Sequence, residues 1–539
     1  FDNLYLPKIN FFHPSIEQRG EKNTMSSLTK EISKRVRRKV PTVANFYSRA
    51  LPSINAKNNF ADAVPSVDAA HFQPLGTWTS EQLNKSRAEN PFAMGWAPNK
   101  ARHAVPNMTH GEGVYLFDDK GNRYLDWTSQ AVCSNLGHDL PEAVIEAASY
   151  QMRLLPYAYG DIGQPEVRTR MNQLMNEILP GDLRAAVYPS SGSEANEAAI
   201  MMARRYTGRQ KVISWYRSYH GATSNSSAAT GDSRRWFGAD NVPGFVKAFN
   251  PFPLFFKPGG HNATEEEMVE ASLVMLEEQI LNEGPENIAS IMTESVLGAG
   301  GCVVFPDGYM QGLRALCDQY GILMHVDEVM MGFGRTGKMF GFQNYDGVVP
   351  DIVTCAKGIS SSAVPMSMMA CSEKVLDFFE DKSIGWGSTY QGHPVAMAVS
   401  YENTKYLLQN NIVGRVKAIA PLFESCMQRL TEDHPSIKQY RSIGLFGCLD
   451  VQDINGKNPK LQHEAANEAF FAYKKEFLRQ GLVGLHRYPH IHCAPPLSIT
   501  EEELIDGFER LDRALDVLDE ALGFHNHQRD LNIDEERAV

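Results

Sequence analysis

The chain has 539 residues and a formal net charge of −12, with 43% apolar and 22% charged residues. That length exceeds what one hydrophobic core usually supports, so we expect two domains, or one large domain with a smaller partner built from the chain ends. No apolar run approaches the roughly 18 residues needed to cross a bilayer, so no membrane span is expected. The acidic balance argues against a nucleic-acid-binding surface, which needs clustered Lys and Arg.

The N-terminal part of the chain differs from the rest in being basic. The segment 25–60 holds eight Lys and Arg residues against one acid, Glu31, with several serines between them. This composition is typical of a mitochondrial transit peptide, and a solvated basic arm would share it. Residues 1–24 lack the bias, so Met25 is a candidate original start. We expect residues 1–60 to form an N-terminal arm. A cleaved leader would place the protein in the mitochondrial matrix, and otherwise it would be cytoplasmic.

From about residue 100, strands alternate with helices, the pattern of a mostly parallel sheet with helices on both faces. Short apolar runs that suit strands buried on both sides occupy 211–215, 287–293, 322–326 and 351–356. The segment 193–206 has apolar residues at the spacing of one buried helical face. The fold class predicted from these patterns is α/β.

Chemically useful side chains follow four of these predicted strands. They are Tyr219 with His220, Glu294, Asp327 and Lys357. Open α/β sheets bind ligands in the crevice beyond the carboxyl ends of their strands. We therefore expect these groups to converge on one site.

The segment 188–197 places Ser191, Gly192 and Ser193 directly before a predicted helix. A helix N-terminus offers free N–H groups and a partial positive charge, and a glycine lets a ligand approach the backbone closely. These features predict a phosphate-binding loop. Ser191 and Glu194 also form an ordinary capping box, which is the commoner meaning of such a pattern.

Asp327 and Lys357 each stand at the end of an apolar strand. A carboxylate there needs a partner, and either backbone amides or a pyridinium nitrogen would serve. Burial lowers the pKa of a lysine, and a neutral amine can attack a carbonyl group. The pair is thus suited to a pyridine-type cofactor.

A competing motif occupies 332–337, which reads G-x-G-x-x-G after a strand, with Asp351 about 20 residues from its first glycine. A dinucleotide-binding fold would want such spacing, followed directly by a helix. The residues from 338 on contain too many turn formers for that helix. The spacing therefore does not predict dinucleotide binding.

Near the C-terminus, Thr500 and Glu503 form a capping box that opens a helix with Leu504, Phe508, Leu511 and Leu515 on one stripe. We place a domain boundary near 381–390. The predicted organisation is a first segment of the small domain over 61–125, a large domain over 126–385, the rest of the small domain over 386–525 and a tail over 526–539.

The eight cysteines form no C-x-x-C pair and indicate reduced thiols in an intracellular compartment. His490, His492 and Cys493 come nearest to a metal cluster. A short strand over 491–494 with polar residues on one face explains them as well, because no second ligand pair accompanies them. We predict no metal site.

Seven segments together resemble class III aminotransferases, which are fold type I pyridoxal 5'-phosphate (PLP) enzymes, over roughly 90–522. They are Ser-Gly-Ser-Glu-Ala-Asn-Glu from 191, Tyr-His-Gly from 219, Glu294 with Gly-Ala-Gly-Gly from 298, the run 325–337, Ala-Lys-Gly from 356, Ser-Thr-Tyr-Gln-Gly-His-Pro from 388, and Pro-Pro-Leu from 495. The resemblance implies a large domain with a mostly parallel sheet and a smaller α+β domain built from the chain ends.

The resemblance also implies roles for individual residues. Asp327 would bind the pyridine nitrogen, Lys357 would form the Schiff base to PLP, and Tyr219 and Val329 would sandwich the ring. The phosphate would be held by Ser191, Gly192 and Ser193, and from the neighbouring subunit by Ser388 and Thr389. A homodimer would therefore share its active sites, and a tetramer is the alternative assembly. His220 and Glu294 complete the implied cofactor site.

Two departures from the family pattern concern Glu294, which is followed by Ser295 and Leu297 where proline and glutamine are usual. The segments around Trp127, Tyr157 and 216–221 look closest to the taurine:pyruvate and ω-amino acid branch, so Trp127 and Tyr157 are candidate substrate contacts. Arg487 is the candidate for the acceptor carboxylate, with a surface arginine as the alternative.

The reaction implied is a ping-pong transfer of an amino group from an amine or ω-amino acid to a keto acid such as pyruvate. An aminomutase, racemase or phospho-lyase could share the scaffold, and none of these needs a second substrate. A binding protein that has lost its chemistry is a further alternative, against which the intact set of Asp327, Tyr219, Lys357 and Thr389 argues.

Overall fold

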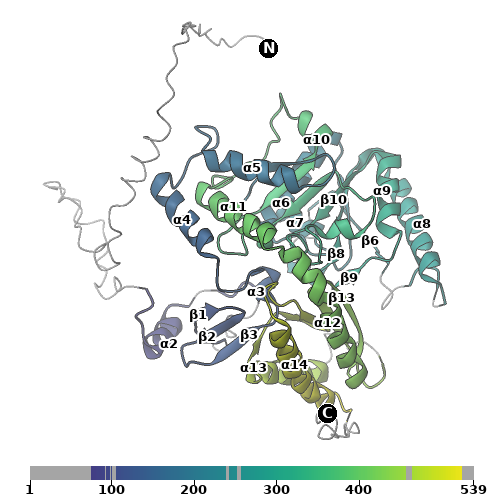
Figure 1. Ribbon diagram of the computed structural model, residues 1–539. Helices are drawn as coiled ribbons and strands as arrows, with labels where there is room; N and C mark the ends of the chain where they lie inside the picture. Colours follow the sequence, from purple (N-terminus) through teal and green to yellow (C-terminus); the bar gives the residue numbers. More distant parts are fainter. Residues whose placement is uncertain are drawn as a thin grey trace, which may run out of the picture. The chain divides into compact units, whose positions relative to one another are not determined.

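The computed structural model describes residues 75–91, 93–96, 99, 105–237, 242–251, 257–260, 262–456 and 464–524. The chain divides into two compact units, Phe1–Thr77 and Trp78–Val539, and the elements below belong to the second (Figure 1). The basic segment 25–60 and the tail 526–539 lie outside the described residues. Within the described part, no helix is both long enough and apolar enough to cross a membrane.

The centre of the second unit is a seven-stranded sheet. In spatial order its strands are β4 (Leu183–Val187), β12 (Met368–Ser372), β11 (Ile352–Cys355), β10 (Leu323–Asp327), β7 (Ile288–Glu294), β5 (Lys211–Trp215) and β6 (Phe245–Ala248). The pairs from β11 to β6 are parallel, whereas β12 runs antiparallel to both of its neighbours. All four predicted strands are present, and the mostly parallel α/β sheet is confirmed.

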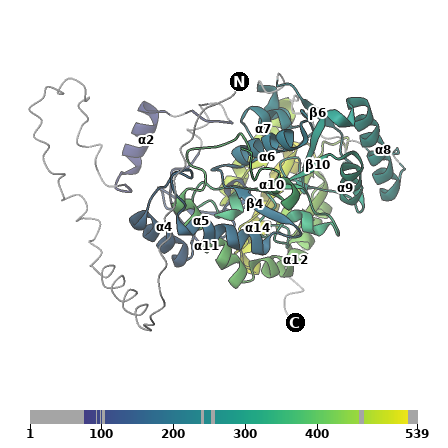
Figure 2. The same cartoon turned by 90° about the horizontal axis from the view of Figure 1, so that it is seen from above.

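Helices cover both faces of this sheet. They include α5 (Glu166–Ile178), α6 (Gly192–Thr207), α7 (Ser224–Ala229), α8 (Glu265–Glu283), α9 (Tyr309–Tyr320) and α10 (Glu373–Asp377). Met202 of α6 shares a core cluster with Leu323 of β10, while Leu313 of α9 shares another with the next strand residue, Met324. Because successive side chains of a strand point to opposite faces, α6 and α9 lie on opposite sides of the sheet. Helix α8 packs beside α9 (Figures 1 and 2).

The carboxyl ends of three neighbouring strands meet at one edge of the sheet. Asp327 at the end of β10 pairs in register with Glu294 of β7 and with Thr354 of β11. Lys357 follows two residues after β11 ends. The predicted convergence of these side chains at the sheet edge is therefore confirmed.

Two smaller four-stranded sheets are assembled from distant parts of the chain. One contains β1 (Met108–Glu112), β2 (Tyr115–Asp118), β3 (Arg123–Asp126) and β15 (Leu482–Val483), and the other contains β13 (Ile437–Ile443), β14 (Phe446–Val451), β17 (His490–Cys493) and β16 (His486–Arg487). Strand β15 pairs in parallel with β3, so chain segments from both ends share one sheet. The predicted division into large and small domains stays a prediction.

The remaining elements connect or flank these sheets. They are α2 (Ser80–Glu89), α3 (Ser129–Val132), α4 (Glu142–Leu154), α11 (Pro394–Gln409), α12 (Ile412–Asp433), α13 (Glu464–Arg479), α14 (Glu501–Ala521), and the short strands β8 (Val296–Leu297) and β9 (Val303–Val304). Helix α14 begins as predicted, because Thr500 Oγ1 accepts the Glu503 N–H and the Glu503 carboxylate accepts the Thr500 N–H. Its predicted apolar stripe is buried.

The glycine motif 332–337 is followed by turns and by the short 3₁₀ helix η7 (Gly341–Asn344). A dinucleotide-binding loop needs a full α-helix at this point, whose N-terminus receives the pyrophosphate. The fold thus agrees with the sequence argument against dinucleotide binding.

Candidate active site

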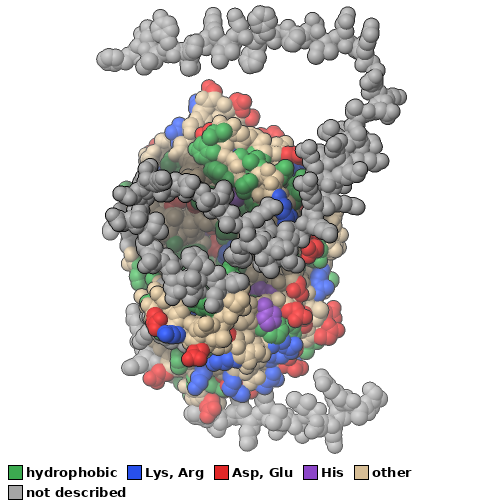
Figure 3. Space-filling model, turned by 90° about the vertical axis from the view of Figure 1, so that its left-hand side faces the viewer, with side chains coloured by type: hydrophobic (Ala, Val, Ile, Leu, Met, Phe, Trp, Pro, Cys, Tyr) green, Lys and Arg blue, Asp and Glu red, His purple; other side chains and the backbone are tan. Residues whose placement is uncertain are grey.

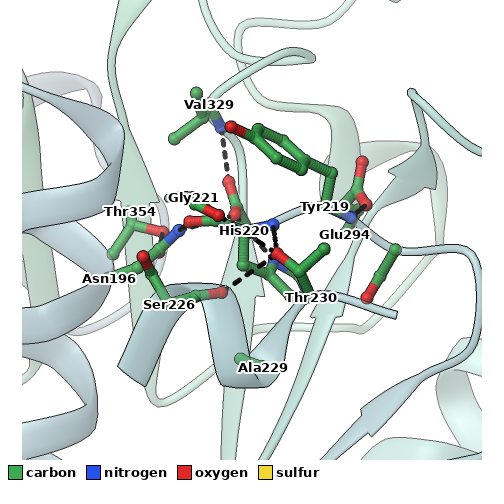
Figure 4. Close-up of polar contacts among 12 residues, drawn as sticks. Asn196, Tyr219, His220, Gly221, Ser226, Ala229, Thr230, Glu294, Val329 and Thr354 are labelled. Atoms are coloured by element: carbon green, nitrogen blue, oxygen red, sulfur yellow. Dashed lines mark hydrogen bonds and ion pairs between the residues drawn. The ribbon is translucent and has the colours of Figure 1, made fainter. Parts of the chain in front are cut away.

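Asp327 lies at the centre of a buried hydrogen-bond network and is 3% exposed. Its Oδ2 accepts from His220 Nδ1 at 2.9 Å and from Asn196 Nδ2 at 2.8 Å, while Oδ1 accepts the Val329 N–H at 2.9 Å. Figure 4 shows Asn196, His220 and Val329, the three residues that supply these donors. A carboxylate oxygen can accept more than one bond, so Oδ1 retains capacity for a cationic ring N–H.

A second layer of side chains fixes the orientation of Asn196. Thr354 Oγ1 donates to Asn196 Oδ1 at 2.6 Å, which leaves the amide nitrogen to donate to Asp327 and to the His220 carbonyl. His325, whose pKa burial lowers to about 3, lies 3.2 Å from the same threonine oxygen. The Asp327 carboxylate is thereby held in one orientation.

Lys357 has a backbone φ of 49°, the left-handed region that non-glycine residues rarely adopt. Such strain persists only where the surrounding structure enforces it, and it concentrates at functional sites. Burial lowers the pKa of the Lys357 amine, against the opposing influence of Cys133, Asp327 and Glu294. The lysine is therefore suited to act as a neutral amine, as predicted.

Glu294 holds two backbone segments next to this lysine. One of its oxygens accepts the Tyr219 N–H at 2.9 Å and the other accepts the Gly298 N–H at 2.7 Å. Burial, followed by repulsion from Asp327, raises the pKa of Glu294 to about 8. Despite Ser295 and Leu297, the glutamate thus lies at the site and positions the backbone of Tyr219.

The ring of Tyr219 is covered by Arg234, whose Cζ lies 3.3 Å from the ring centroid, while the Trp96 ring stands edge-on at 6.4 Å. Asp232 accepts from the Arg234 guanidinium through both carboxylate oxygens, Nε donating to Oδ1 and Oδ2 and Nη2 to Oδ2. Burial raises the pKa of Tyr219, and the positive charges of Arg234 and Arg487 oppose that shift. Arg487 is therefore near Tyr219, together with a second arginine that the sequence did not single out.

A cavity of about 290 Å³ opens beside this arginine. Trp96, Ala222, Arg234 and Phe237 are among its lining residues. Since Arg234 also lowers the pKa of Lys357, its charge is felt at the amine. An acid group bound in this cavity would meet the charge of Arg234, whose field reaches Lys357.

The predicted phosphate loop lies at the start of α6. A Cβ at Gly192 would come within 2.9 Å of Val329 Cγ2, so only glycine leaves this space open. Ser193 Oγ accepts the Ala222 N–H at 3.2 Å, and Ser191 Oγ accepts the Glu194 N–H at 3.3 Å as the helix cap. The first intrahelical bond is made by Ala195, so the N–H groups of Gly192 and Ser193 face outward, as an anion requires.

Ser388 and Thr389 lie apart from this group and next to Tyr157. The Tyr157 hydroxyl donates to the Thr389 carbonyl at 2.6 Å, and its ring lies 5.7 Å from that of His393. Tyr157 and the Ser388–Thr389 turn therefore lie together at the surface of this chain. Their predicted contacts with substrate and phosphate stay predictions.

Trp127 occupies a different environment from the one predicted. Its side chain is fully buried, its ring packs edge-on against Phe508 at 4.9 Å, and a Cβ at Gly507 would come within 2.1 Å of it. A ring that fills the core under α14 has no surface for a ligand, so this placement contradicts the prediction of a substrate contact.

The loop after Trp127 is strained and is tied down by Arg335. Ser129, Gln130 and Val132 all have positive φ angles. The guanidinium of Arg335, with the residue 0% exposed, donates to the Leu445 and Pro495 carbonyls at 2.9 and 2.6 Å, to Ser129 Oγ at 3.1 Å and to Asn135 Oδ1 at 3.3 Å. Arg335, which belongs to the 332–337 motif, thus links the loop that leads to Cys133 to the segments around Leu445 and Pro495.

Sequence reasoning missed Asn196 and Arg234 as members of the site, and Arg335 as the residue that holds the nearby segment 129–135. Asn196 carried a signal, since it is a polar residue amid the alanines on the buried face of α6. Arg234 carried none, because its neighbour Arg235 is chemically identical and only one of the two lies over Tyr219.

Known proteins share both the sequence and the fold of this chain. The family described as aminotransferase class III matches residues 97–515. A putrescine–pyruvate aminotransferase from Pseudomonas aeruginosa is 32% identical over 409 residues, which cover 74% of this chain and 87% of that protein. A mitochondrial gamma-aminobutyrate transaminase from Solanum lycopersicum is 29% identical over 87% of this chain and 90% of its own length.

Solved structures agree with this result. A taurine:2-oxoglutarate aminotransferase from Bifidobacterium kashiwanohense, in complex with PLP and glutamate, superposes with a TM-score of 0.76 at 34% identity and covers 83% of this chain and 99% of that one. An (S)-enantioselective omega-transaminase from Thermomicrobium roseum gives 0.77 at 33% identity, with 82% and 99% covered.

Proposed function

The chain belongs to the class III aminotransferase family, and on this basis we propose that it is a PLP-dependent transaminase whose reactive centre is formed by Lys357, Asp327 and Tyr219. The observation that carries the proposal is the placement of a strained, half-buried lysine within the electrostatic influence of a buried, tightly oriented carboxylate at the carboxyl edge of the sheet. When bound, PLP supplies an aldehyde that bonds amines and a protonated ring that accepts electrons from the bond broken at the substrate carbon.

Asp327 would keep the cofactor ring protonated. Its Oδ1 has room for the ring N–H, and Oδ2 is already satisfied by His220 and Asn196. Each pKa unit by which the carboxylate favours the protonated ring is equivalent to about 1.4 kcal/mol.

Lys357 would act twice. As a neutral amine it would hold the cofactor at its aldehyde, and as a free amine it would move a proton at the substrate carbon. A positioned general base typically contributes about 10²- to 10⁴-fold in rate. The Glu294 carboxyl, with its raised pKa, keeps additional negative charge away from this amine near neutral pH.

Tyr219 and Val329 would enclose the ring from its two faces, and the N–H groups of Gly192 and Ser193, with Ser191, would hold the phosphate. The close approach of Gly192 to Val329 supports this, because any side chain at 192 would fill the intervening space. His220 acts on Asp327 through its Nδ1–H.

The substrates are proposed to carry an acid group. Arg487 and Arg234 both place positive charge near Tyr219, and an arginine binds carboxylates and sulfonates through paired N–H donors. The known relatives include enzymes named for taurine, gamma-aminobutyrate and putrescine as donors. The two arginines favour the first two, since putrescine is a dication that they would repel.

A donor and acceptor screen tests the function. Taurine, gamma-aminobutyrate, β-alanine and putrescine are each mixed with enzyme, PLP and either pyruvate or 2-oxoglutarate, and the new amino acid is measured. Lys357→Ala should bind PLP without a covalent bond and transfer no amino group. Substantial activity in this variant, or wild-type protein that produces no amino acid from any pair, would refute the proposal and favour an aminomutase, racemase or lyase.

We also propose a homodimer with shared sites, in which Ser388, Thr389 and Tyr157 serve the partner's site. Exposed apolar side chains on and after α4 support an interface, among them Ile145, Met152, Leu154, Tyr159 and Ile162. Figure 3 shows apolar side chains gathered on this side of the molecule. Sedimentation of wild-type protein and of Thr389→Ala would test it, since the variant should stay dimeric while binding PLP more weakly.

The basic composition of 25–60 supports a further proposal, that this segment is a mitochondrial transit peptide. Mass spectrometry of protein isolated from its source provides the test. An intact segment 25–60 in the mature protein would exclude the leader.

A further inference from the structure

A group of buried and half-buried ionisable side chains lies outside the proposed reactive centre. Its members are Asp450 on β14, Arg441 on β13, His490 on β17 and Arg217, just after β5. Asp450 is 0% exposed and accepts from Arg441 at 2.5 and 2.8 Å. His490 Nδ1 lies 2.6 Å from Asp450 Oδ1, and His490 Nε2 lies 2.8 Å from Arg217 Nη2. The histidine therefore connects the small sheet to a residue 273 positions earlier in the chain.

The hydrogen-bond pattern fixes the protonation of His490. A guanidinium only donates, so Nε2 must be the acceptor from Arg217. Nδ1 then carries the proton and donates to the Asp450 carboxylate. This neutral tautomer agrees with the lowered pKa of His490, which burial causes and the two arginines reinforce. Rotation of the ring would break both bonds, so its orientation is set by two ionic partners.

The same residues do not suit a metal ion. Ligand atoms of Cys448, Asp450 and His490 lie within 4.8 Å of one another. However, Arg441 occupies both oxygens of Asp450, and Arg217 occupies the free nitrogen of His490. A cation would have to displace two guanidinium groups, and burial raises the pKa of the Cys448 thiol instead of favouring a thiolate. The charged group is thus complete by itself.

Arg217 passes this restraint to Tyr219. It has a φ of 73° and stands two residues before the tyrosine. A Cβ at Gly300 would come within 2.8 Å of the Arg217 carbonyl oxygen, and a Cβ at Gly301 within 2.9 Å of the His490 ring. The loop 298–301 is therefore in close contact with both partners, and Arg441 Nε donates to the Gly301 carbonyl at 2.8 Å.

A second connection reaches the same tyrosine from the other side. His492, the next inward-facing residue of β17, has Nε2 3.1 Å from the Gly298 carbonyl. The Gly298 N–H donates to Glu294, which also accepts the Tyr219 N–H. Strand β17 is thus linked to the backbone of Tyr219 both through Arg217 and through Glu294.

We propose that His490 is a positioning residue, which sets the height and tilt of the Tyr219 ring over the cofactor by holding Arg217 against the Asp450–Arg441 pair. This inference rests on the proposed function, because it assigns a role to the tyrosine that stacks on PLP. It would act through backbone position alone, since the hydrogen bonds of the imidazole go to Asp450 and Arg217 and not to Tyr219, Asp327 or Lys357.

The test measures the circular dichroism of the bound cofactor at its visible band, which reports the tilt of the ring, together with kcat and KM. His490→Leu leaves Asp450 and Arg217 without their bridge and should weaken the dichroism and lower kcat by about 10- to 100-fold, the cost of a displacement near 1 Å. His490→Gln, whose amide can donate to Asp450 and accept from Arg217, should recover most of both. In a Tyr219→Ala background, His490→Leu should cause little further loss.

Two other variants separate positioning from stability. His434→Gln alters another buried histidine, whose ring nitrogens lie 2.7 Å from Asp512 and Asp519, and should lower the melting temperature with unchanged dichroism. Arg217→Met leaves the Asp450–His490 bond intact and should reproduce the dichroism loss, which decides the question if His490→Leu does not fold.

Wild-type dichroism and kcat in folded His490→Leu, or in Arg217→Met, would overturn the inference, as would additive effects of His490→Leu and Tyr219→Ala. In that case an active wild-type enzyme would leave the proposed function standing. A wild-type protein without transaminase activity would overturn both.

Discussion

Replacing Arg234 tests whether this transaminase recognises an acid group. Its side chain is 9% exposed and is held by Asp232 above the Tyr219 ring. A hydrogen bond to a charged group contributes about 1.5–3 kcal/mol, and because Asp232 already offsets part of the charge, we expect about 1.5–2 kcal/mol here. Since about 1.4 kcal/mol corresponds to a tenfold change in a binding constant, Arg234→Gln should raise KM for an acid-bearing substrate about 10- to 30-fold.

The assay compares β-alanine with n-propylamine, which has a similar length and no carboxylate. Loss of the stack on Tyr219 would affect both donors, so the change in the ratio of their kcat/KM values isolates the acid group. Arg235→Gln is the matched control, because Arg235 lies on the same short helix, donates to the Gly231 carbonyl and lies over Tyr216 instead. It should leave the ratio unchanged.

Equal losses for both donors would show that Arg234 only supports Tyr219. An unchanged KM for β-alanine would assign acid recognition to Arg487 alone. Either result would refute the two-arginine account.

Three further outcomes follow from the geometry. Asp327→Asn removes the charge that favours a protonated cofactor ring. Since an opposite charge shifts the pKa of a neighbouring group by about 1–3 units, the rate of the half-reaction should fall about 10- to 10³-fold. Stopped-flow rates equal to those of the wild type would contradict this. Burial raises the pKa of Glu294 to about 8 in the folded protein, so the folded state binds this proton more tightly than the unfolded state. The protonated carboxyl therefore contributes fully to the free energy of unfolding below about pH 4.3, and this contribution is lost as the pH rises through 8. Urea denaturation of cofactor-free protein should therefore show wild type losing a few kcal/mol relative to Glu294→Gln between pH 5 and pH 9, and parallel profiles would count against it. Arg335→Met leaves several buried acceptors unpaired and should lower the free energy of unfolding by about 3 kcal/mol or more, whereas a change below about 1 kcal/mol would show that the loop 129–135 does not depend on it.

The buried polar groups around Asp327 explain how one buried carboxylate is both hydrogen-bonded and oriented. Asn196 and His220 donate to the same oxygen, and Thr354 fixes the amide that does so. These three donors come from different elements: Asn196 from α6, His220 from the loop after β5, and Thr354 from β11. A ring nitrogen bound there would meet an acceptor that needs no reorganisation.

The sequence by itself determined the sheet and the meeting of several polar side chains at one of its edges. Short apolar runs located the strands because a strand buried on both faces must be apolar throughout. Since parallel strands end at one edge, Glu294, Asp327 and Lys357 could be expected there together, and the register of β7, β10 and β11 places them so. These are consequences of local pattern and short connections.

Only the tertiary structure decided which of the remaining residues belong to the site. Arg234 and Arg235 are equivalent in sequence, and packing alone puts the first over Tyr219. Trp127 was expected at the substrate and lies in the core, because it directly follows β3 and its ring packs against Phe508 of α14. Arg217 and His490 meet across 273 residues, and no periodicity constrains a contact of that separation. Such contacts depend on how the sheets pack against one another, which is a property of the whole chain and not of any window within it.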